Sequence, residues 1–303
     1  MKSFRFHTVV IVATLAVLLV CLSLAARNSS GQSPSPRTDT LVKPTALVVA
    51  RPASAENTAS PFVSAAAQNV QLENDLSWLF GGKQQRGWYL YSSLIDRTLN
   101  IANDAKPTDF ASALSIWQKK MILNPDGVLD EPSFMAMVSA WQSDRLKDRS
   151  LAAPDQLLTA PVTDFFDPER LDELRQVERK TYAAYKLMVA AAIKDLNLTH
   201  TAQGELAPTE KYLKIISAFR SREYQEQLRR QSPHVGTAGL AINSPHFTGR
   251  ALDLYVGGDP VDTRDSNRAI QVRTPVYQWL VRNADRFGFR PYFYEPWHWE
   301  YVK

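Results

Sequence analysis

The sequence predicts an α+β protein in which a helical part precedes a domain with a small antiparallel sheet flanked by helices. Large apolar residues recur at helical spacing within positions 69–150, whereas strand-like apolar runs occur at 212–219 and 289–302. The strands and helices do not alternate regularly, so a parallel βαβ arrangement is not expected. The chain has 303 residues, which is enough for about two domains.

Composition and charge are those of an ordinary globular protein. Apolar residues make up 45% and charged residues 22%, and the formal net charge is +4. No basic run with interleaved aromatic residues occurs, so nucleic-acid binding is not expected. The single cysteine, Cys21, excludes an intrachain disulfide and a cysteine-based zinc site. Any metal ligands must therefore be histidines or carboxylates.

The first 26 residues predict a signal peptide or a membrane anchor. Lys2 and Arg5 precede an apolar run at 8–26 that is just long enough to span a bilayer. The anchor, with its basic end in the cytoplasm, is slightly favoured over cleavage after the small residues at 23–25. Both alternatives place the rest of the chain outside the cytoplasm, in the periplasm or at the cell surface.

Two segments follow the apolar run. Residues 27–68 are rich in Ser, Pro, Thr and Ala, with few large apolar side chains, which predicts a disordered tether. Residues 69–150 predict a helical domain with two helices around an Asn-Pro-Asp-Gly turn at 124–127.

Residues 160–303 predict the second, larger domain. Thr274 and Pro275 favour the start of a helix, and Gly288 lies just past its expected end. The other expected elements are an amphipathic helix with apolar positions from Leu171 to Ala191, a buried strand at 212–219, a helix at 222–230 and a strand-like tail at 289–302.

Two late segments contain residues that are suited to a metal site. Positions 244–253 include His246 and Asp253, and positions 295–301 include His298. Together they offer two imidazoles and one carboxylate, and a catalytic zinc takes three protein ligands while a fourth position stays open for water. A nearby carboxylate is then needed to accept the proton of that water.

The spacing leaves two candidates for this base. In a strand at 297–301, His298 and Glu300 would share one face. Pro296 often marks a strand start or a bulge, and such a break would bring Glu295 beside His298. Glu295 is weakly favoured by this argument, and Glu300 stays a rival.

These segments resemble VanY-type D-alanyl-D-alanine carboxypeptidases, in the zinc peptidase superfamily of lysostaphin, D-Ala-D-Ala peptidases and Sonic hedgehog. Positions 244–253 fit the family pattern S-x-H-x-x-G-x-A-x-D, and positions 295–298 fit E-x-W-H. The resemblance implies a Zn²⁺ cofactor. It also implies roles for four residues, with His246, Asp253 and His298 as metal ligands and Glu295 as general base.

A third match lies upstream, where positions 217–225 fit the family pattern S-x-[YF]-R-S-x-x-x-Q. By resemblance, Arg220 stabilises negative charge on the substrate carbonyl, while Gln225 and Ser244 contact the substrate. Trp297 is expected in the wall of the substrate pocket. The three matches occur in the expected order between about residue 177 and the end of the chain.

Residues 105–145 resemble small helical peptidoglycan-binding-like domains, which consist of an apolar helix with Gln, a loop with Asp-Gly-Val and a second helix ending in an aromatic residue and Gln. Wall binding is the favoured interpretation of this region. The alternative is a helical spacer whose Trp and Phe residues form its core.

The expected function is therefore zinc-dependent hydrolysis of peptidoglycan stem peptides, most simply the removal of a terminal D-alanine. One alternative is an endopeptidase that uses the same residues. Another is a non-catalytic wall-binding protein. No Ser-x-x-Lys, Gly-x-Ser-x-Gly or His-Glu-x-x-His pattern occurs, so serine peptidase and thermolysin-like mechanisms are not expected.

Overall fold

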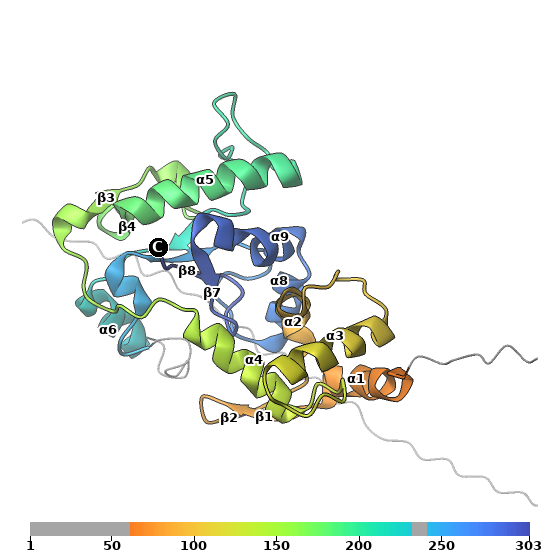
Figure 1. Cartoon of the computed structure of the whole chain (residues 1–303). Helices are drawn as coiled ribbons and strands as arrows, with labels where there is room; N and C mark the ends of the chain where they lie inside the picture. Colours follow the sequence, from red (N-terminus) through yellow and green to blue (C-terminus); the bar gives the residue numbers. More distant parts are fainter. Residues whose placement is uncertain (1–60, 232–240) are drawn as a thin grey trace, which may run out of the picture. The chain divides into compact units, whose positions relative to one another are not determined.

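The computed structural model describes residues 61–231 and 241–303, which belong to one compact unit of the chain (Figure 1). Within these ranges, no helix combines the length and the apolar character needed to cross a bilayer. The predicted signal or anchor, including the apolar run at 8–26, lies outside the described residues. So does most of the predicted tether at 27–68.

The expected tether is too long at its C-terminal end. Helix α1 spans Val63–Asp75 and so begins five residues before residue 68, the expected end of the tether. Ala65 and Ala66 of this helix are buried against Ala111, which gives the segment a small apolar cluster of its own. Composition alone did not reveal this contact.

The N-terminal part contains four helices and one hairpin among the described residues. The helices are α1, α2 (Ser92–Leu99), α3 (Pro107–Lys120) and α4 (Glu131–Ser143). The last two confirm the helix pair around the turn at 124–127. The hairpin of β1 (Ser77–Phe80) and β2 (Lys83–Arg86) corrects the all-helical expectation for this region. Trp78 anchors the hairpin, because its side chain is buried in the core.

Gln118 explains the Gln and Asp-Gly-Val pattern of this region. Its buried side chain donates to the Val128 carbonyl at 2.9 Å and accepts from the Gly127 amide at 2.9 Å. Gly127 has φ of 77°, and a Cβ there would lie 2.5 Å from the Ala111 carbonyl oxygen. The pattern therefore closes the loop between α3 and α4.

The C-terminal part is built around a four-stranded antiparallel sheet with strand order β5-β6-β8-β7. The strands are β5 (Ile215–Ser217), β6 (Ala251–Leu254), β7 (Phe289–Pro291) and β8 (His298–Tyr301). A smaller sheet pairs β3 (Leu157–Thr159) with β4 (Gln176–Glu178). This combination of helices with small antiparallel sheets confirms the α+β class.

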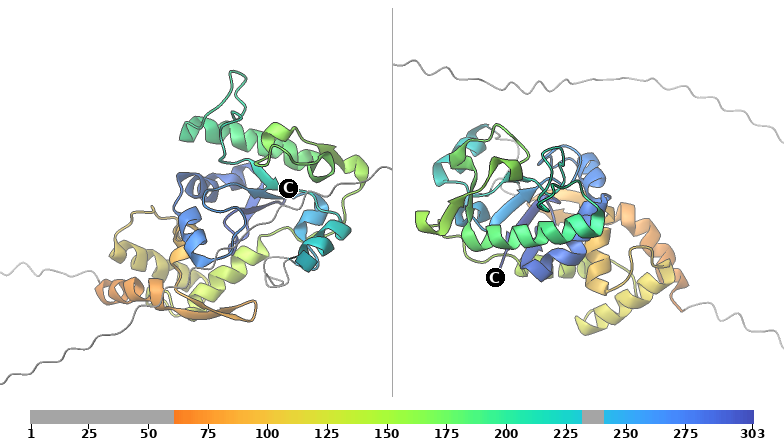
Figure 2. Two further views of the ribbon diagram at one scale, coloured as in Figure 1. Left: turned by 180° about the vertical axis from the view of Figure 1, so that it is seen from behind. Right: turned by 90° about the horizontal axis from the view of Figure 1, so that it is seen from above.

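Helices lie on both sides of the larger sheet. In Figure 1 and the rear view of Figure 2, the sheet lies between α5 on one side and α3 and α4 on the other. The C-terminal helices are α5 (Arg179–Leu196), α6 (Arg222–Gln231), α8 (Asp265–Val272) and α9 (Pro275–Asn283).

Several expected boundaries in this part are confirmed. Helix α6 covers the predicted helix at 222–230. Thr274 caps α9, because its hydroxyl accepts from the Tyr277 amide at 3.2 Å, and Pro275 is the first helical residue. A 3₁₀ turn continues the helix to Gly288, whose φ of 91° ends it.

Two expected elements are shorter in the structure. The long amphipathic helix starts at Arg179, because the Glu178 carboxylate accepts from the Lys180 and Thr181 amides and caps it there. Leu171 lies outside the helix and is 59% exposed. The strand expected at 212–219 is limited to Ile215–Ser217, since Leu213 has a positive φ of 64°.

One hydrophobic core joins the N-terminal helices to the sheet. Phe293, in the turn between β7 and β8, has its ring centroid 4.8 Å from that of Phe80 and 6.1 Å from that of Trp141. The turn between the last two strands is therefore packed against residues of the N-terminal part.

Asp96 of α2 is a buried acid that should make stability depend on pH. Burial, and to a smaller extent the Glu73 carboxylate, raises the pKa of Asp96 from 3.8 to about 7. Between these values the unfolded chain loses its proton first, so stability falls as pH rises through this window. Asp96→Asn should therefore raise the free energy of unfolding at pH 8 by about 2–4 kcal/mol and have little effect near pH 4. Urea unfolding at both pH values measures this. An equal effect at pH 4 and pH 8 would contradict it.

Candidate metal centre

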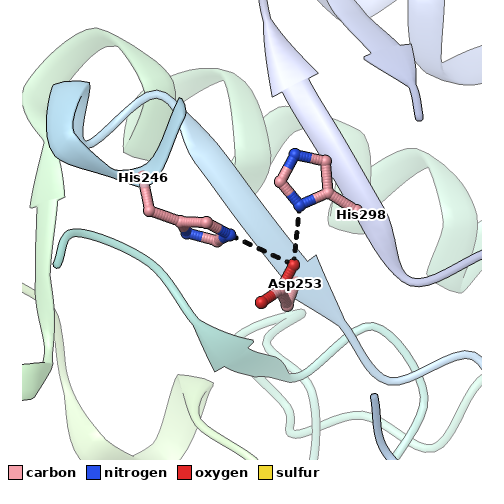
Figure 3. Close-up of side chains that lie close together, drawn as sticks. All are labelled: His246, Asp253 and His298. Carbon is pink, nitrogen blue, oxygen red and sulfur yellow. Dashed lines mark hydrogen bonds and ion pairs between the residues drawn. The ribbon is translucent and has the colours of Figure 1, made fainter. Parts of the chain in front are cut away.

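Sheet pairing brings two of the predicted ligands together. Strands β6 and β8 are antiparallel neighbours in which Asp253 lies directly opposite His298. His246 comes from a 3₁₀ turn, Pro245–Thr248, that precedes β6. All three side chains are buried and point toward one another (Figure 3). One potential ligand atom from each lies within 4.8 Å of the others.

The geometry of this group fits a small divalent cation. Asp253 Oδ1 lies 3.3 Å from His246 Nε2 and 2.9 Å from His298 Nδ1. Ligand atoms at about 2.0–2.1 Å from a tetrahedral zinc ion are roughly 3.3 Å apart. Two nitrogens and one oxygen are a donor set that zinc accepts, and three ligands leave a fourth position for water. The residues present therefore fit a catalytic zinc centre.

The turn that carries His246 is shaped by its neighbours. The Ser244 hydroxyl accepts from the His246 amide at 3.3 Å and begins the turn. Gly249 ends it with φ of 65°, and a Cβ there would lie 2.9 Å from the Glu178 amide nitrogen. His246 Nδ1 lies 2.6 Å from the Ala218 carbonyl oxygen. With its proton donated to that carbonyl, the ring presents Nε2 to the centre.

Arg220 is closely associated with the predicted ligand Asp253. Its Nη2 donates to Asp253 Oδ2 at 2.5 Å, and its Nε donates to the Ser217 hydroxyl at 2.9 Å. Because Oδ2 is held in this way, Oδ1 is the oxygen that faces both histidines. Arg220 therefore orients a ligand in addition to any contact with substrate.

Gln225 lies behind Arg220 and is buried. Its Oε1 accepts from Arg220 Nη1 at 3.3 Å, and its Nε2 donates to the Ala241 carbonyl at 2.9 Å. It lines a neighbouring groove. Gln225 therefore supports Arg220, and its contact with substrate stays a prediction. Ser244 and Trp297 do line the cavity beside the three predicted ligands.

Glu295 lies outside β8, in the turn before it, because the chain turns at Pro296 and the strand begins at His298. Its carboxylate is buried, lines the same cavity as the three predicted ligands and makes no hydrogen bond or ion pair with another described residue. Burial raises the pKa of Glu295 to about 8, although the charges of His298 and Arg220 oppose the shift. A carboxyl group whose pKa lies near neutrality can both accept a proton from water and release it again.

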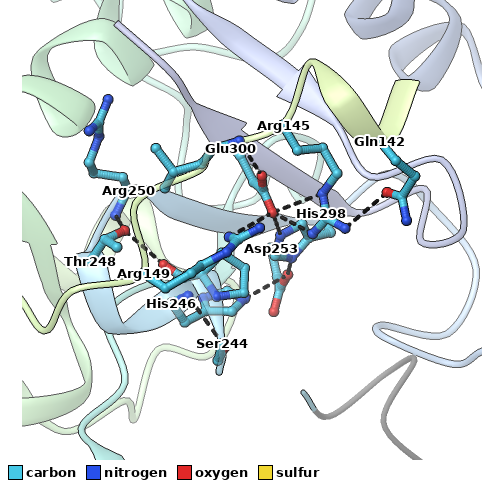
Figure 4. Close-up of polar contacts among 12 residues, drawn as sticks. Gln142, Arg145, Arg149, Ser244, His246, Thr248, Arg250, Asp253, His298 and Glu300 are labelled. Atoms are coloured by element: carbon cyan, nitrogen blue, oxygen red, sulfur yellow. Dashed lines mark hydrogen bonds and ion pairs between the residues drawn. The ribbon is translucent and has the colours of Figure 1, made fainter. Parts of the chain in front are cut away.

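Glu300, the rival base, is fully buried and shares a face of β8 with His298 (Figure 4). Its Oε1 lies 3.1 Å from His298 Nε2 and accepts from Arg145 Nη2 at 2.5 Å. Burial raises the pKa of Glu300, but the hydrogen bonds from His298 and Arg145 outweigh it and hold the pKa well below its usual range. Because its oxygens already accept several donors, Glu300 is poorly suited to accept a proton from water.

The three predicted ligands differ in their affinity for protons. Burial and the Arg220 charge lower the pKa of His246 to about 4. Burial opposes protonation of His298 too, but its contacts with Asp253 and Glu300 outweigh burial and raise the pKa to about 9. The pKa of Asp253 is well below its usual range, because His246 and Arg220 overcome the effect of burial. Asp253 is therefore an anion, which a cation ligand must be.

A cavity of about 420 Å³ opens over this group. Its wall carries Arg145, Arg149, Arg170 and Arg220 together with the acids Asp253 and Glu295. Three of these arginines lie before residue 177, where sequence patterns gave no reason to select them.

A buried three-ligand centre with a free carboxylate in the same cavity is the arrangement of metal-dependent hydrolases. Residues 177–303 match the family model VanY, D-alanyl-D-alanine carboxypeptidase. The chain is thus a metallopeptidase of the D-alanyl-D-alanine carboxypeptidase type. None of the curated proteins matches the chain.

Three solved structures are similar to parts of the chain. The LdcB LD-carboxypeptidase, in a structure that reveals the basis of peptidoglycan recognition, is 22% identical, with a TM-score of 0.37 over 51% of this chain and 71% of that one. VanYB in complex with D-alanine-D-alanine is 21% identical, with a TM-score of 0.30 over 45% and 76%. A mutant of the vancomycin-resistance D,D-pentapeptidase VanY, in complex with Zn(II), is 19% identical, with a TM-score of 0.30 over 51% and 88%. These structural similarities are too low to support the family, which is indicated by the match at 177–303.

Proposed function

We propose that this protein is a zinc-dependent peptidase that removes the terminal D-alanine from peptidoglycan stem peptides. The observation that carries the proposal is the position of Glu295. It is a buried carboxylate without a partner among the described residues, and it lines the same cavity as His246, Asp253 and His298. A scaffold that only bound the cell wall would have no use for such a group.

The geometry supports a role for each of these residues. His246, Asp253 and His298 hold the zinc ion, which when bound lowers the pKa of water and polarises a carbonyl group. Glu295 accepts the proton of the attacking water and passes it to the leaving amine. Arg220 stabilises the negative charge that develops on the carbonyl oxygen, and its contact with Asp253 keeps the guanidinium at the centre.

The charge of the cavity favours a substrate with a free carboxylate. Among the described residues of its wall, four are arginines and two are acids, and a third acid, Glu300, pairs with Arg145 and Arg149. Arg170 forms no ion pair with another described residue, and its Nε donates to the Leu174 carbonyl at 3.0 Å. Its remaining donors are available to a C-terminal carboxylate. Such a contact supports carboxypeptidase rather than endopeptidase activity, because an internal peptide bond has no adjacent carboxylate terminus.

Arg170→Ala should raise KM for a pentapeptide stem about 10- to 100-fold, which is the value of a hydrogen bond to a charged group, with a smaller change in kcat. The matched control is the same peptide with an amidated C-terminus, for which the wild type and the variant should have similar KM values. Steady-state kinetics with both peptides measure this. Equal losses with the acid and the amide would show that Arg170 does not recognise the carboxylate.

Release of D-alanine from a purified pentapeptide stem by the zinc-loaded protein tests the proposed reaction. Cleavage of cross-linked muropeptides without release of free D-alanine would favour the endopeptidase. If neither substrate is hydrolysed at any zinc concentration, the alternative of a non-catalytic wall-binding protein gains support. Mass spectrometry of the digests distinguishes the three outcomes.

We further propose that the protein acts outside the cytoplasm, where its substrate is, and that residues 8–26 export or anchor it. Binding of the helical part to the cell wall is also a proposal. Its Trp141 is partly buried and donates to the Thr98 hydroxyl at 2.9 Å. Sedimentation of the protein with purified sacculi tests wall binding.

A further inference from the structure

A buried acid and a segment from the N-terminal part meet behind His298. Arg145 Nε and Nη2 donate to Glu300 Oε1 at 3.1 and 2.5 Å, and the Leu146 amide donates to Oε2 at 2.9 Å. Arg149 Nη1 lies 3.4 Å from Oε1. Both oxygens of Glu300 are therefore held by residues that directly follow α4. Figure 4 shows Glu300 between Arg145 and His298.

Arg145 is itself held in place on three sides. Its Nη1 donates to the Gln142 side chain at 3.1 Å. Its guanidinium carbon lies 3.9 Å from the centre of the Tyr292 ring, within the range of a cation–π contact. Its side chain is only 14% exposed. These contacts fix the position of the guanidinium.

We infer that Arg145 and Glu300 form a brace that positions the metal ligand His298, so that the N-terminal part supplies a component of the metal centre. The inference rests on the proposed zinc site. It goes beyond the family match, because Arg145 lies before residue 177.

The brace has a clear physical basis. If His298 binds a metal through Nδ1, its proton must be on Nε2, which lies 3.1 Å from Glu300. A carboxylate that accepts from the second ring nitrogen fixes the tautomer and the ring orientation of a metal-binding histidine. Glu300 is fully buried, and a buried carboxylate without a cation would lose its charge or leave its place. Arg145 supplies that cation, and its planar guanidinium directs two donors, Nε and Nη2, at the same oxygen of Glu300.

The test compares Arg145→Ala, Arg145→Lys and Glu300→Gln with the control Arg97→Ala. Arg97 is matched to Arg145, because it also joins the N-terminal helices to the C-terminal part, through an ion pair with Asp285 at 2.8 Å that lies away from the metal centre. Competition with a chromophoric chelator measures zinc affinity. The visible spectrum of the Co²⁺-substituted protein reports ligand geometry, and thermal unfolding of the metal-free protein reports folding.

We expect Arg145→Ala and Glu300→Gln to lower zinc affinity about 10- to 100-fold and to alter the Co²⁺ spectrum. The zinc affinity of Arg145→Lys should lie between that of these two variants and that of the wild type. This variant keeps the positive charge and so tests the brace even if the other two variants fail to fold. Arg97→Ala should bind zinc normally. Wild-type zinc affinity in folded Arg145→Ala and Glu300→Gln, or an equal loss in Arg97→Ala, would overturn the brace. If the wild type binds zinc but hydrolyses no stem peptide, the proposed function is wrong. The zinc affinities of the variants still test the brace in that case.

Discussion

Glu295→Gln is expected to lower kcat for D-alanine release about 10²- to 10⁴-fold while zinc binding stays normal. Glutamine has nearly the same size and can accept a hydrogen bond from water, but it cannot take the proton. The site should therefore fill with metal and bind substrate without turnover. Zinc content by mass spectrometry and single-turnover kinetics measure the two properties separately.

Glu300→Gln is the matched control for this prediction, because it removes the other carboxylate beside His298. Glu300 contacts His298 and Arg145 and does not line the cavity within the described part of the chain. Its loss should lower zinc affinity, whereas kcat at saturating zinc should fall much less than in Glu295→Gln. The reverse pattern would make Glu300 the base and would remove the observation on which the proposed function depends.

His298→Ala is expected to lower zinc affinity about 10³-fold or more. Structural zinc sites have binding free energies of about 10–16 kcal/mol, so the loss of one of three protein ligands removes several kcal/mol. The variant also leaves Asp253 without the ring nitrogen that lies 2.9 Å from it. Activity should disappear together with the metal, and excess zinc should restore little of it. Chelator competition and zinc content after dialysis measure the loss.

His200→Ala provides the control for removal of a histidine. His200 is exposed, and its Nδ1 lies 2.9 Å from the Leu198 carbonyl oxygen, remote in sequence from all three predicted ligands. This variant should retain zinc and activity. If His298→Ala retains the wild-type zinc content, the metal is held elsewhere and the assignment of the centre to these three residues is wrong.

The convergence of the three candidate ligands was predictable because their residue types and spacing are specific. Asp253 is the seventh residue after His246, which leaves room for the turn that ends at Gly249 and for the start of β6. The break at Pro296 was also foreseen, and it is this break that puts Glu295 in a turn rather than on the opposite face from His298. The start of α9 was also predictable, because its signal, Thr274 followed by Pro275, lies within neighbouring residues.

Features that depend on distant packing could not be predicted. The alternation of residues along the strand predicted that Glu300 shares a face with His298. It could not predict the arginines that bind Glu300, since Arg145 and Glu300 are 155 residues apart. The hairpin of β1 and β2 was missed because its outer strand is entirely polar, with only Trp78 buried to anchor it. Gln225 fits a family pattern, yet the structure shows that its contacts are with Arg220 and a backbone carbonyl.

The packing of Phe293 determines where this enzyme can be divided. Two residues before Glu295, its ring fits among Trp78, Phe80 and Trp141, all of which lie upstream of the family match. A recombinant fragment cut at residue 160 would leave that ring in water beside the turn that carries Glu295. A working peptidase fragment is therefore expected to extend beyond the homologous domain and to include the β1–β2 hairpin and α4.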